Sequence, residues 1–385
     1  MEIKLSPLEV ISLRQLVREA IQMYEIIIKL VNTDKQLLGL LSNSIIPFLA
    51  FIVDGMIKFF PDDVDYSENN LSLENDKFKK FVVKIRVGHK LYNDKRYTKK
   101  LRMMREIQSN NIEFLTSDYN CLQQEVIEII GQKDYGTFSY DGIDYFNNMQ
   151  GYIYLAYLFE NTSKVKYKEG RQYYNDTIRN ISSSLTVVLK SSVEGFVNAW
   201  GLIIDKESKI NIDSRRFSTE DSFLIDSTRK DIFNDMLPSE VQIFLHSNLC
   251  QMNFVSVILP DVLENRADLY IRFMIITYLE AIKSLDIIVK ENESLQDITG
   301  IKISEVLNNK IYKLLSKGNI RNNVAHYNIR GYSITNLEDR VDTDNLLMKI
   351  IELETGADFY TFWKDFLFQF EQLKQLIESL IFSSW

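Results

Sequence analysis

The sequence is poor in the residues that interrupt regular structure. Among its 385 residues are 14 Gly and 5 Pro, and the last proline is Pro260. Because glycine and proline both weaken helices, this scarcity favours long helices, above all in the C-terminal part. Hydrophobic residues make up 45% and charged residues 25% of the chain, which excludes wholesale disorder and the collagen-like and disulfide-scaffold classes.

Cysteine is scarce too, with only Cys121 and Cys250. Two distant thiols form neither a disulfide framework nor, by themselves, a structural zinc site. The N-terminal residues lack the basic and apolar regions of a signal peptide, so we expect a cytoplasmic protein. Uncharged runs at 36–53 and 241–260 are interpreted as buried helices, and no membrane is expected. A membrane span, as in a membrane-damaging effector, is an alternative for the first run only.

The chain has fewer basic than acidic residues, but many of its basic residues lie in one segment. Lys plus Arg total 45 and Asp plus Glu 53, a net charge of −8, so the molecule as a whole repels nucleic acid. Residues 77–105 are the exception, with Asp94 as their one acidic residue and aromatic residues interleaved. This basic segment contains Lys77, Lys79, Lys80, Lys84, Arg86, Lys90, Lys95, Arg96, Lys99, Lys100, Arg102 and Arg105. It fits contact with an RNA backbone, but pairing with the acidic loop at 61–76 or docking of a protein or nucleic-acid regulator fits equally well.

Hydrophobic spacing predicts a mainly α-helical chain with a small β element. Apolar residues recur at helical spacing at 8–31, and 34–60 indicates one or two further helices. Apolar and basic residues alternate at 80–88 and predict a strand, while Asp141-Gly142 between two alternating runs predicts a hairpin at 137–146. Further helices are expected at about 147–160, 170–202, 238–258, 266–291, 303–317, 319–328, 343–354 and 357–382.

A polar stretch divides these elements into two groups. We expect a helical domain with the small β element at 1–204, which carries the basic segment and has a regulatory or RNA-binding role. A linker or loop region is expected at 205–237, and a helical bundle at 238–385. The closing helix has an apolar stripe at three- and four-residue spacing, which is typical of a core or dimer interface.

One string near the C-terminus carries residues suited to phosphate chemistry: Lys317-Gly-Asn-Ile-Arg-Asn-Asn-Val-Ala-His-Tyr-Asn-Ile-Arg330. Gly318 is expected to close the preceding helix and Asn319 to cap the next one, so that RNNVAH opens a short helix. Histidine exchanges protons near neutral pH, and arginine offers phosphate a permanent charge and two parallel donors. On a helix, Arg321 and His326 would lie about 140° apart and share no narrow face.

Arg-Asn-x-x-x-His in an all-helical C-terminal region resembles the HEPN superfamily of metal-independent ribonucleases. The resemblance covers about residues 240–383 and is greatest to the ancillary ribonucleases of type III CRISPR systems and to abortive-infection and toxin nucleases. It implies that Arg321 and His326 are catalytic, that Asn322 supports them, and that no metal or cofactor is needed. It also implies a homodimer, because the family's active site forms where two such domains meet and this chain offers one motif.

One departure limits what the resemblance implies. Those ancillary ribonucleases carry an N-terminal Rossmann-like domain that senses cyclic oligoadenylate, whereas residues 1–200 show neither alternating buried strands and helices nor a glycine-rich loop after a strand. Activation by cyclic oligoadenylate is therefore not carried over. The expected role is a defence or toxin endoribonuclease that is regulated by its own N-terminal half.

The expected reaction uses the 2′-OH of RNA as the nucleophile and leaves 2′,3′-cyclic phosphate ends. His326 would handle protons, Arg321 would stabilise the charged transition state, and Asn322 would orient the site. Substrate contacts are expected from Lys317, Tyr327, Arg330, Lys84, Arg86, Lys99, Lys100 and Arg102. His246, on an apolar helix, is expected to be structural, and His89 ends the basic strand.

Two alternatives remain open at this point. Arg321 can be a surface ion-pair residue and His326 a partly buried structural histidine. The chain would then be a helical RNA-binding or protein-interaction scaffold with a degenerate HEPN fold.

Overall fold

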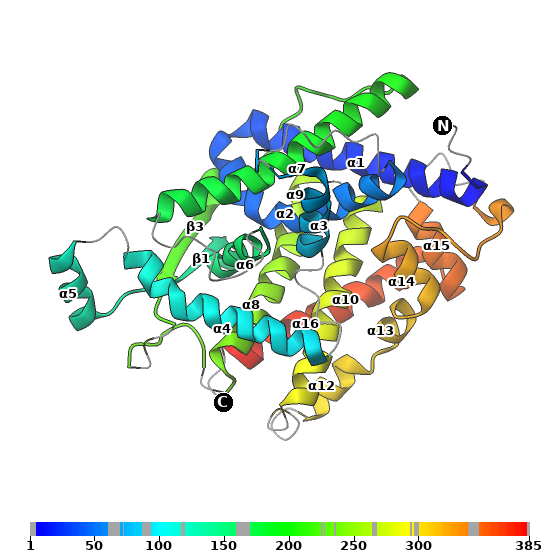
Figure 1. The fold of residues 1–385 in the computed structure, drawn as a ribbon. Helices are drawn as coiled ribbons and strands as arrows, with labels where there is room; N and C mark the ends of the chain where they lie inside the picture. Colours follow the sequence, from blue (N-terminus) through cyan, green and yellow to red (C-terminus); the bar gives the residue numbers. More distant parts are fainter. Residues whose placement is uncertain are drawn as a thin grey trace.

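The fold is mainly α-helical with one small sheet, as the sequence predicts (Figure 1). The computed structural model describes residues 5–60, 70–71, 73–86, 94–116, 120–158, 170–224, 226, 228–234, 236–263, 268–292, 295, 300–337 and 346–382. The N-terminal helices are α1 (Pro7–Thr33), α2 (Lys35–Phe59), α3 (Asn75–Arg86), α4 (Asp94–Thr116), α5 (Cys121–Ile130), α6 (Asn148–Leu158) and α7 (Gly170–Trp200). The C-terminal helices are α8 (Ser239–Asn253), the π-helical turn η4 (Phe254–Ile258), α9 (Leu259–Val262), α10 (Asp268–Glu291), α12 (Gly300–Leu307), α13 (Lys310–Leu315), α14 (Gly318–Ala325), α15 (Leu346–Thr355) and α16 (Phe359–Ile381), with a 3-10 turn η5 (Ile334–Asn336).

Helix α1 begins where the sequence places the signals of a helix start. Ser6 and Glu9 form a capping box at the start of α1, in which the Glu9 carboxylate accepts the Ser6 backbone N–H at 2.8 Å and the Ser6 hydroxyl accepts the Glu9 N–H at 3.4 Å. Pro7 follows at the first helical position, where its missing N–H leaves no bond unmade.

The predicted hairpin is confirmed, and a third strand joins it. Strands β1 (Tyr135–Tyr140) and β2 (Ile143–Asn147) pair antiparallel across Asp141 and Gly142, whose φ angles of 50° and 79° are those of a type I′ turn. Strand β3 (Phe217–Ser222), preceded by a 3-10 turn η3 (Ser214–Arg216), pairs antiparallel with the other side of β1, in the order β2-β1-β3. The stretch expected to be a linker at 205–237 therefore contributes an edge strand.

The strand predicted at 80–88 is wrong, because 75–86 form helix α3. Its buried residues Phe78, Phe81, Val82 and Ile85 follow helical spacing, and Val83 is 40% exposed. Positions 81 and 85 satisfy the strand pattern and the helix pattern alike, and packing against α2 decides between them. Only the helix buries Val82 while it turns Val83 outward.

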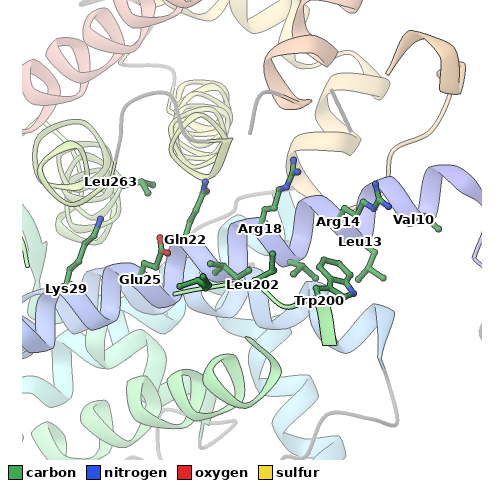
Figure 2. A pocket seen from close by; sticks show the side chains of 13 residues that line it. Val10, Leu13, Arg14, Arg18, Gln22, Glu25, Lys29, Trp200, Leu202 and Leu263 are labelled. Carbon is green, nitrogen blue, oxygen red and sulfur yellow. The ribbon is translucent and has the colours of Figure 1, made fainter. Parts of the chain in front are cut away.

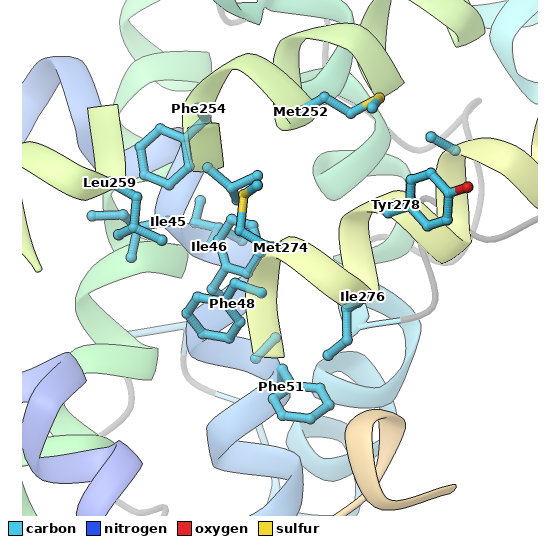
Figure 3. Packing of buried hydrophobic residues seen from close by; sticks show 14 of the residues in the cluster. Ile45, Ile46, Phe48, Phe51, Met252, Phe254, Leu259, Met274, Ile276 and Tyr278 are labelled. Atoms are coloured by element: carbon cyan, nitrogen blue, oxygen red, sulfur yellow. The ribbon is translucent and has the colours of Figure 1, made fainter. Parts of the chain in front are cut away.

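A single hydrophobic cluster joins residues on both sides of 205–237. Figure 3 shows its centre, where Phe48 and Phe51 of α2 meet Met274 and Ile276 of α10. The Phe48 ring centroid lies 4.3 Å from that of Phe273. The stretches Gly39–Phe59 and Ser239–Val262 are long and apolar enough to cross a membrane, but 78% and 83% of them are buried within the fold, as in core helices.

A buried polar network fastens the hairpin to α8, and it contains His246. The Tyr135 hydroxyl lies 2.6 Å from Nδ1 of His246, and Nε2 lies 3.1 Å from Oδ2 of Asp144. Burial opposes ionisation of Asp144, but its bonds with His246 and Ser139 outweigh that effect and lower its pKa. The ionised carboxylate accepts a hydrogen bond from the Nε2–H of His246. Nδ1 therefore accepts a hydrogen bond from the Tyr135 hydroxyl. His246 thus has the structural role expected of it.

Replacing the tyrosine tests this network. Tyr135→Phe leaves a fully buried ring nitrogen without its donor, so we expect the free energy of unfolding to fall by about 1–3 kcal/mol. Denaturant unfolding measures the change. Tyr360→Phe is the matched control, because Tyr360 is 61% exposed and the change there should stay within about 0.5 kcal/mol. Equal stability of the two variants would contradict a structural role for the network.

Candidate active site at the end of helix α14

Helix α14 carries the RNNVAH string and buries one face of it. Ile320, Asn323 and Val324 are buried, whereas Arg321 and Asn322 are exposed. The N-cap is Lys317, and Gly318 is the first helical residue, so the predicted left-handed glycine and Asn319 cap are wrong. Asn309 and Ser316 cap α13 instead.

His326 stands at the point where α14 ends. Its backbone is extended, with φ −149° and ψ 144°, and its N–H donates to the Asn322 carbonyl at 3.0 Å. The side chain is exposed. Because His326 lies outside the helix, the expected 140° separation from Arg321 does not apply. The histidine side chain is instead set by the chain's exit from the helix.

The carbonyl end of α14 is held by a buried arginine from α10. The Arg272 Nη1 donates to the carbonyls of Asn323 and Val324, both at 2.7 Å. The last carbonyls of a helix have no partner within it, and a guanidinium satisfies two of them at once. Since the Arg272 side chain is 0% exposed, this contact fixes the end of α14 from inside the fold.

Glu19 of α1 neutralises Arg272. The Arg272 Nε lies 2.6 Å from the Glu19 carboxylate, which also accepts the Tyr327 hydroxyl at 2.7 Å. Burial opposes the charge on Arg272, but Glu19 outweighs that effect and raises its pKa. Burial, reinforced by the Glu19 charge, raises the pKa of Tyr327 well above its ordinary value. The guanidinium lies 4.6 Å from the centre of the Tyr327 ring, so Glu19, Arg272 and Tyr327 form one buried cluster.

The absence of a side chain at Gly55 of α2 admits the Tyr327 ring. A Cβ at Gly55 would lie 2.6 Å from Cδ2 of Tyr327 and 2.9 Å from Cδ1 of Leu16. The Tyr327 ring also packs 5.3 Å from that of Phe51, between centroids. Tyr327 is therefore enclosed by α1, α2 and α10, and it anchors the chain after His326 instead of contacting a substrate as predicted.

Arg86, the last residue of α3, reaches the same place from the basic segment. Its Nη1 lies 3.4 Å from Nδ1 of His326 and 3.4 Å from the Ala325 carbonyl oxygen. Its Nε lies 3.0 Å from Oδ2 of Asp54 on α2, and these two side chains are 10% and 5% exposed. Two features that the sequence presents separately, the basic segment and the RNNVAH string, thus meet at His326.

The other predicted substrate residues fall into two groups. Lys317 and Arg330 are exposed near α14, and Arg330 Nε donates to the Asn328 side chain at 2.9 Å. Lys99 and Arg102 are exposed on α4, whereas Lys84 is half-buried on α3. Lys100 differs from the prediction: it is buried, and its Nζ lies 5.4 Å from the centre of the Phe244 ring. His89, Lys90 and the side chains of Lys95 and Arg96 lie outside the described residues.

The predicted site does not include the buried residues that hold it, namely Glu19, Asp54 and Arg272. A signal exists for one of them. Arg272 stands within the apolar string Leu269-Tyr-Ile-Arg-Phe-Met-Ile-Ile, and a charge there requires a buried partner. Its partner Glu19 lies 253 residues away in sequence, so no local pattern identifies the pair.

Two cavities among the described residues are lined by side chains other than Arg321, Asn322 and His326. A groove of about 820 Å³ runs along α1 and ends at Trp200, Leu202 and Leu263; Figure 2 shows Arg14 and Arg18 along it. A cavity of about 30 Å³ next to Arg86 is lined by Asn248 and Gln251 among others. That volume holds one or two water molecules, so a nucleotide would have to bind over the exposed face of α14. Among the described residues, no group of three His, Cys, Asp or Glu is placed to hold a metal ion.

Comparisons with protein-family models, curated proteins and solved structures find no match to this chain.

The free energy of unfolding of variants tests whether the buried ion pair stabilises the fold. Glu19→Gln leaves the Arg272 charge without its counter-ion, so we expect the free energy of unfolding to fall by about 3–5 kcal/mol. The double variant Glu19→Leu with Arg272→Met removes both charges and should lose less than the two single changes together. Urea denaturation measures all four variants: Glu19→Gln, Glu19→Leu, Arg272→Met and the double variant.

Glu106→Gln is the control, because Glu106 pairs with Arg102 at 3.9 Å on the surface and its side chain is 48% exposed. Its expected cost is at most about 1 kcal/mol. If Glu19→Gln and Glu106→Gln lowered the free energy of unfolding equally, the buried pair would not be what holds the site.

Proposed function

We propose that the chain is a metal-independent endoribonuclease that cleaves single-stranded RNA and leaves 2′,3′-cyclic phosphate and 5′-OH ends. RNA carries its own nucleophile, so the protein has to move protons and stabilise the charged transition state. His326 handles protons, Arg321 stabilises the charge on the phosphorus centre, and Asn322 orients the site by hydrogen bonding. The proposal rests on the resemblance of the RNNVAH string to the HEPN motif.

The observation that supports the proposal best is the exposure of these residues on a helix end held from within. Arg321, Asn322 and His326 are all exposed, and beneath them Arg272 fixes the carbonyl end of α14 at 2.7 Å. Arg330, four residues after His326, and Lys317, at the N-cap of α14, are both exposed, so the surface around this helix offers positive charge that attracts a polyanion.

The proposed active unit is a homodimer in which two copies of α14 share one RNA phosphate. One chain supplies one Arg–His pair, and a phosphorane carries charge on several oxygens that two arginines would share. We further propose a cytoplasmic defence or toxin effector, regulated by the N-terminal half through the contact at His326.

A non-catalytic RNA-binding or protein-interaction scaffold with a degenerate HEPN fold is the second candidate. The contact between Arg86 and His326 favours the scaffold, because a ring nitrogen that accepts a hydrogen bond from a guanidinium is less available for proton transfer. In that case the exposed cations would bind RNA without cutting it.

Cleavage in EDTA separates the two candidates. We expect the wild type to cut end-labelled single-stranded RNA, and Arg321→Ala and His326→Ala each to lower the rate by at least about 100-fold, because each removes a group that acts on the transition state. Filter binding should show that RNA affinity changes far less than the rate.

Arg179→Ala is the matched control, since Arg179 is an exposed arginine on α7 that pairs with Asp176 at 3.2 Å. It should cut like the wild type. Equal cleavage by wild type and His326→Ala would contradict the nuclease, and RNA binding by every protein without cleavage by any would favour the scaffold.

A further inference from the structure

We infer that Arg86 holds most of the protein in a resting state in which His326 accepts a proton poorly, so that the wild type cleaves slowly, and that releasing Arg86 activates the site. The activating effect rests on the proposed ribonuclease function. The restraint on the imidazole does not, and it can be measured without any substrate.

The chemistry of the guanidinium defines the state of the ring. An arginine side chain has N–H donors, no acceptor and a permanent charge. The Arg86 Nη1 lies 3.4 Å from Nδ1 of His326, so Nδ1 can only be the acceptor in this contact. A neutral imidazole carries a single ring proton, which must then be on Nε2.

A ring in this state is a poor catalyst of proton transfer. A general base needs an available lone pair, but that of Nδ1 points to Arg86 and Nε2 already carries hydrogen. Protonating the ring would turn an N–H of the imidazole toward an N–H of the guanidinium and place a second positive charge beside the first. While Arg86 stays in place, His326 is therefore held as a neutral ring that neither readily takes nor readily gives a proton.

The contacts of Arg86 show which bonds break on release. At 3.4 Å, its contacts with His326 and the Ala325 carbonyl are longer than an ordinary hydrogen bond. Its ion pair with Asp54 is 3.0 Å and almost buried, and Asp54 is also bonded by Lys58 at 2.6 Å. When α3 and α14 separate, Arg86 therefore stays with Asp54 and leaves His326.

Two measurements on the full-length protein test the inference. The first is the titration of His326 by NMR in protein with labelled histidine, which has only three histidines and which His326→Gln assigns. Removing the neighbouring cation by Arg86→Gln should raise the pH midpoint of this ring by about one unit or more. Asp54→Asn removes a carboxylate and leaves the Arg86 charge beside the ring, so it should not raise the midpoint. The second measurement is the rate of RNA cleavage in EDTA, which should rise at least about tenfold in Arg86→Gln.

Arg179→Gln is the control for both measurements and should change neither. An unchanged midpoint in Arg86→Gln, or a cleavage rate that falls as in His326→Ala, would overturn the inference. A raised midpoint with no cleavage by any variant would overturn the nuclease and the activation while still supporting the restraint. The failure of one proposal is therefore distinguishable from the failure of the other.

Discussion

The buried ion pair between Arg272 and Glu19 is the contact on which the arrangement of the candidate site depends. Helix α14 has eight residues, too few to be stable by itself. Its carbonyl end is held because Arg272 donates to it, and Arg272 is tolerated inside the core because Glu19 faces it. The Tyr327 hydroxyl shares the same carboxylate. One pair of charges thus joins α1, α10 and α14 and fixes where the chain leaves the helix.

Two arginines contact the end of α14 at different distances. Arg272, which is not exposed to solvent, makes bonds of 2.7 Å to the carbonyls of Asn323 and Val324. Arg86, whose side chain is 10% exposed, makes contacts of 3.4 Å with the Ala325 carbonyl and His326. The strong contacts position the backbone and the weak ones restrain the imidazole. In the proposed regulation, α3 would act on the histidine without disturbing α14.

The sequence predicts those features whose cause is local. Asp141-Gly142 has the backbone freedom that a type I′ turn requires, and the long helices follow their apolar spacing. Prediction fails where tertiary contacts decide, as at α3, whose positions 81 and 85 suit a strand and a helix equally. Strand β3 leaves no apolar alternation in the sequence, because most of its side chains are exposed.

The candidate site, too, is only partly predictable from the sequence. Arg321, Asn322 and His326 are recognisable because their types and spacing suit phosphate chemistry, and all three prove to be exposed near one helix end. Arg272 is recognisable as a charge within an apolar string, but its pairing with Glu19 is not, since the two are 253 residues apart. Only the fold brings the two together.

The most direct test of the central claim is the chemistry of the RNA ends. The account requires the 2′-OH at the cut position to attack the adjacent phosphate, so products should carry 2′,3′-cyclic phosphate and 5′-OH ends, and one 2′-O-methyl nucleotide should abolish cleavage at its own position alone. Products with 3′-OH and 5′-phosphate ends, or unchanged cleavage at the methylated position, would contradict it.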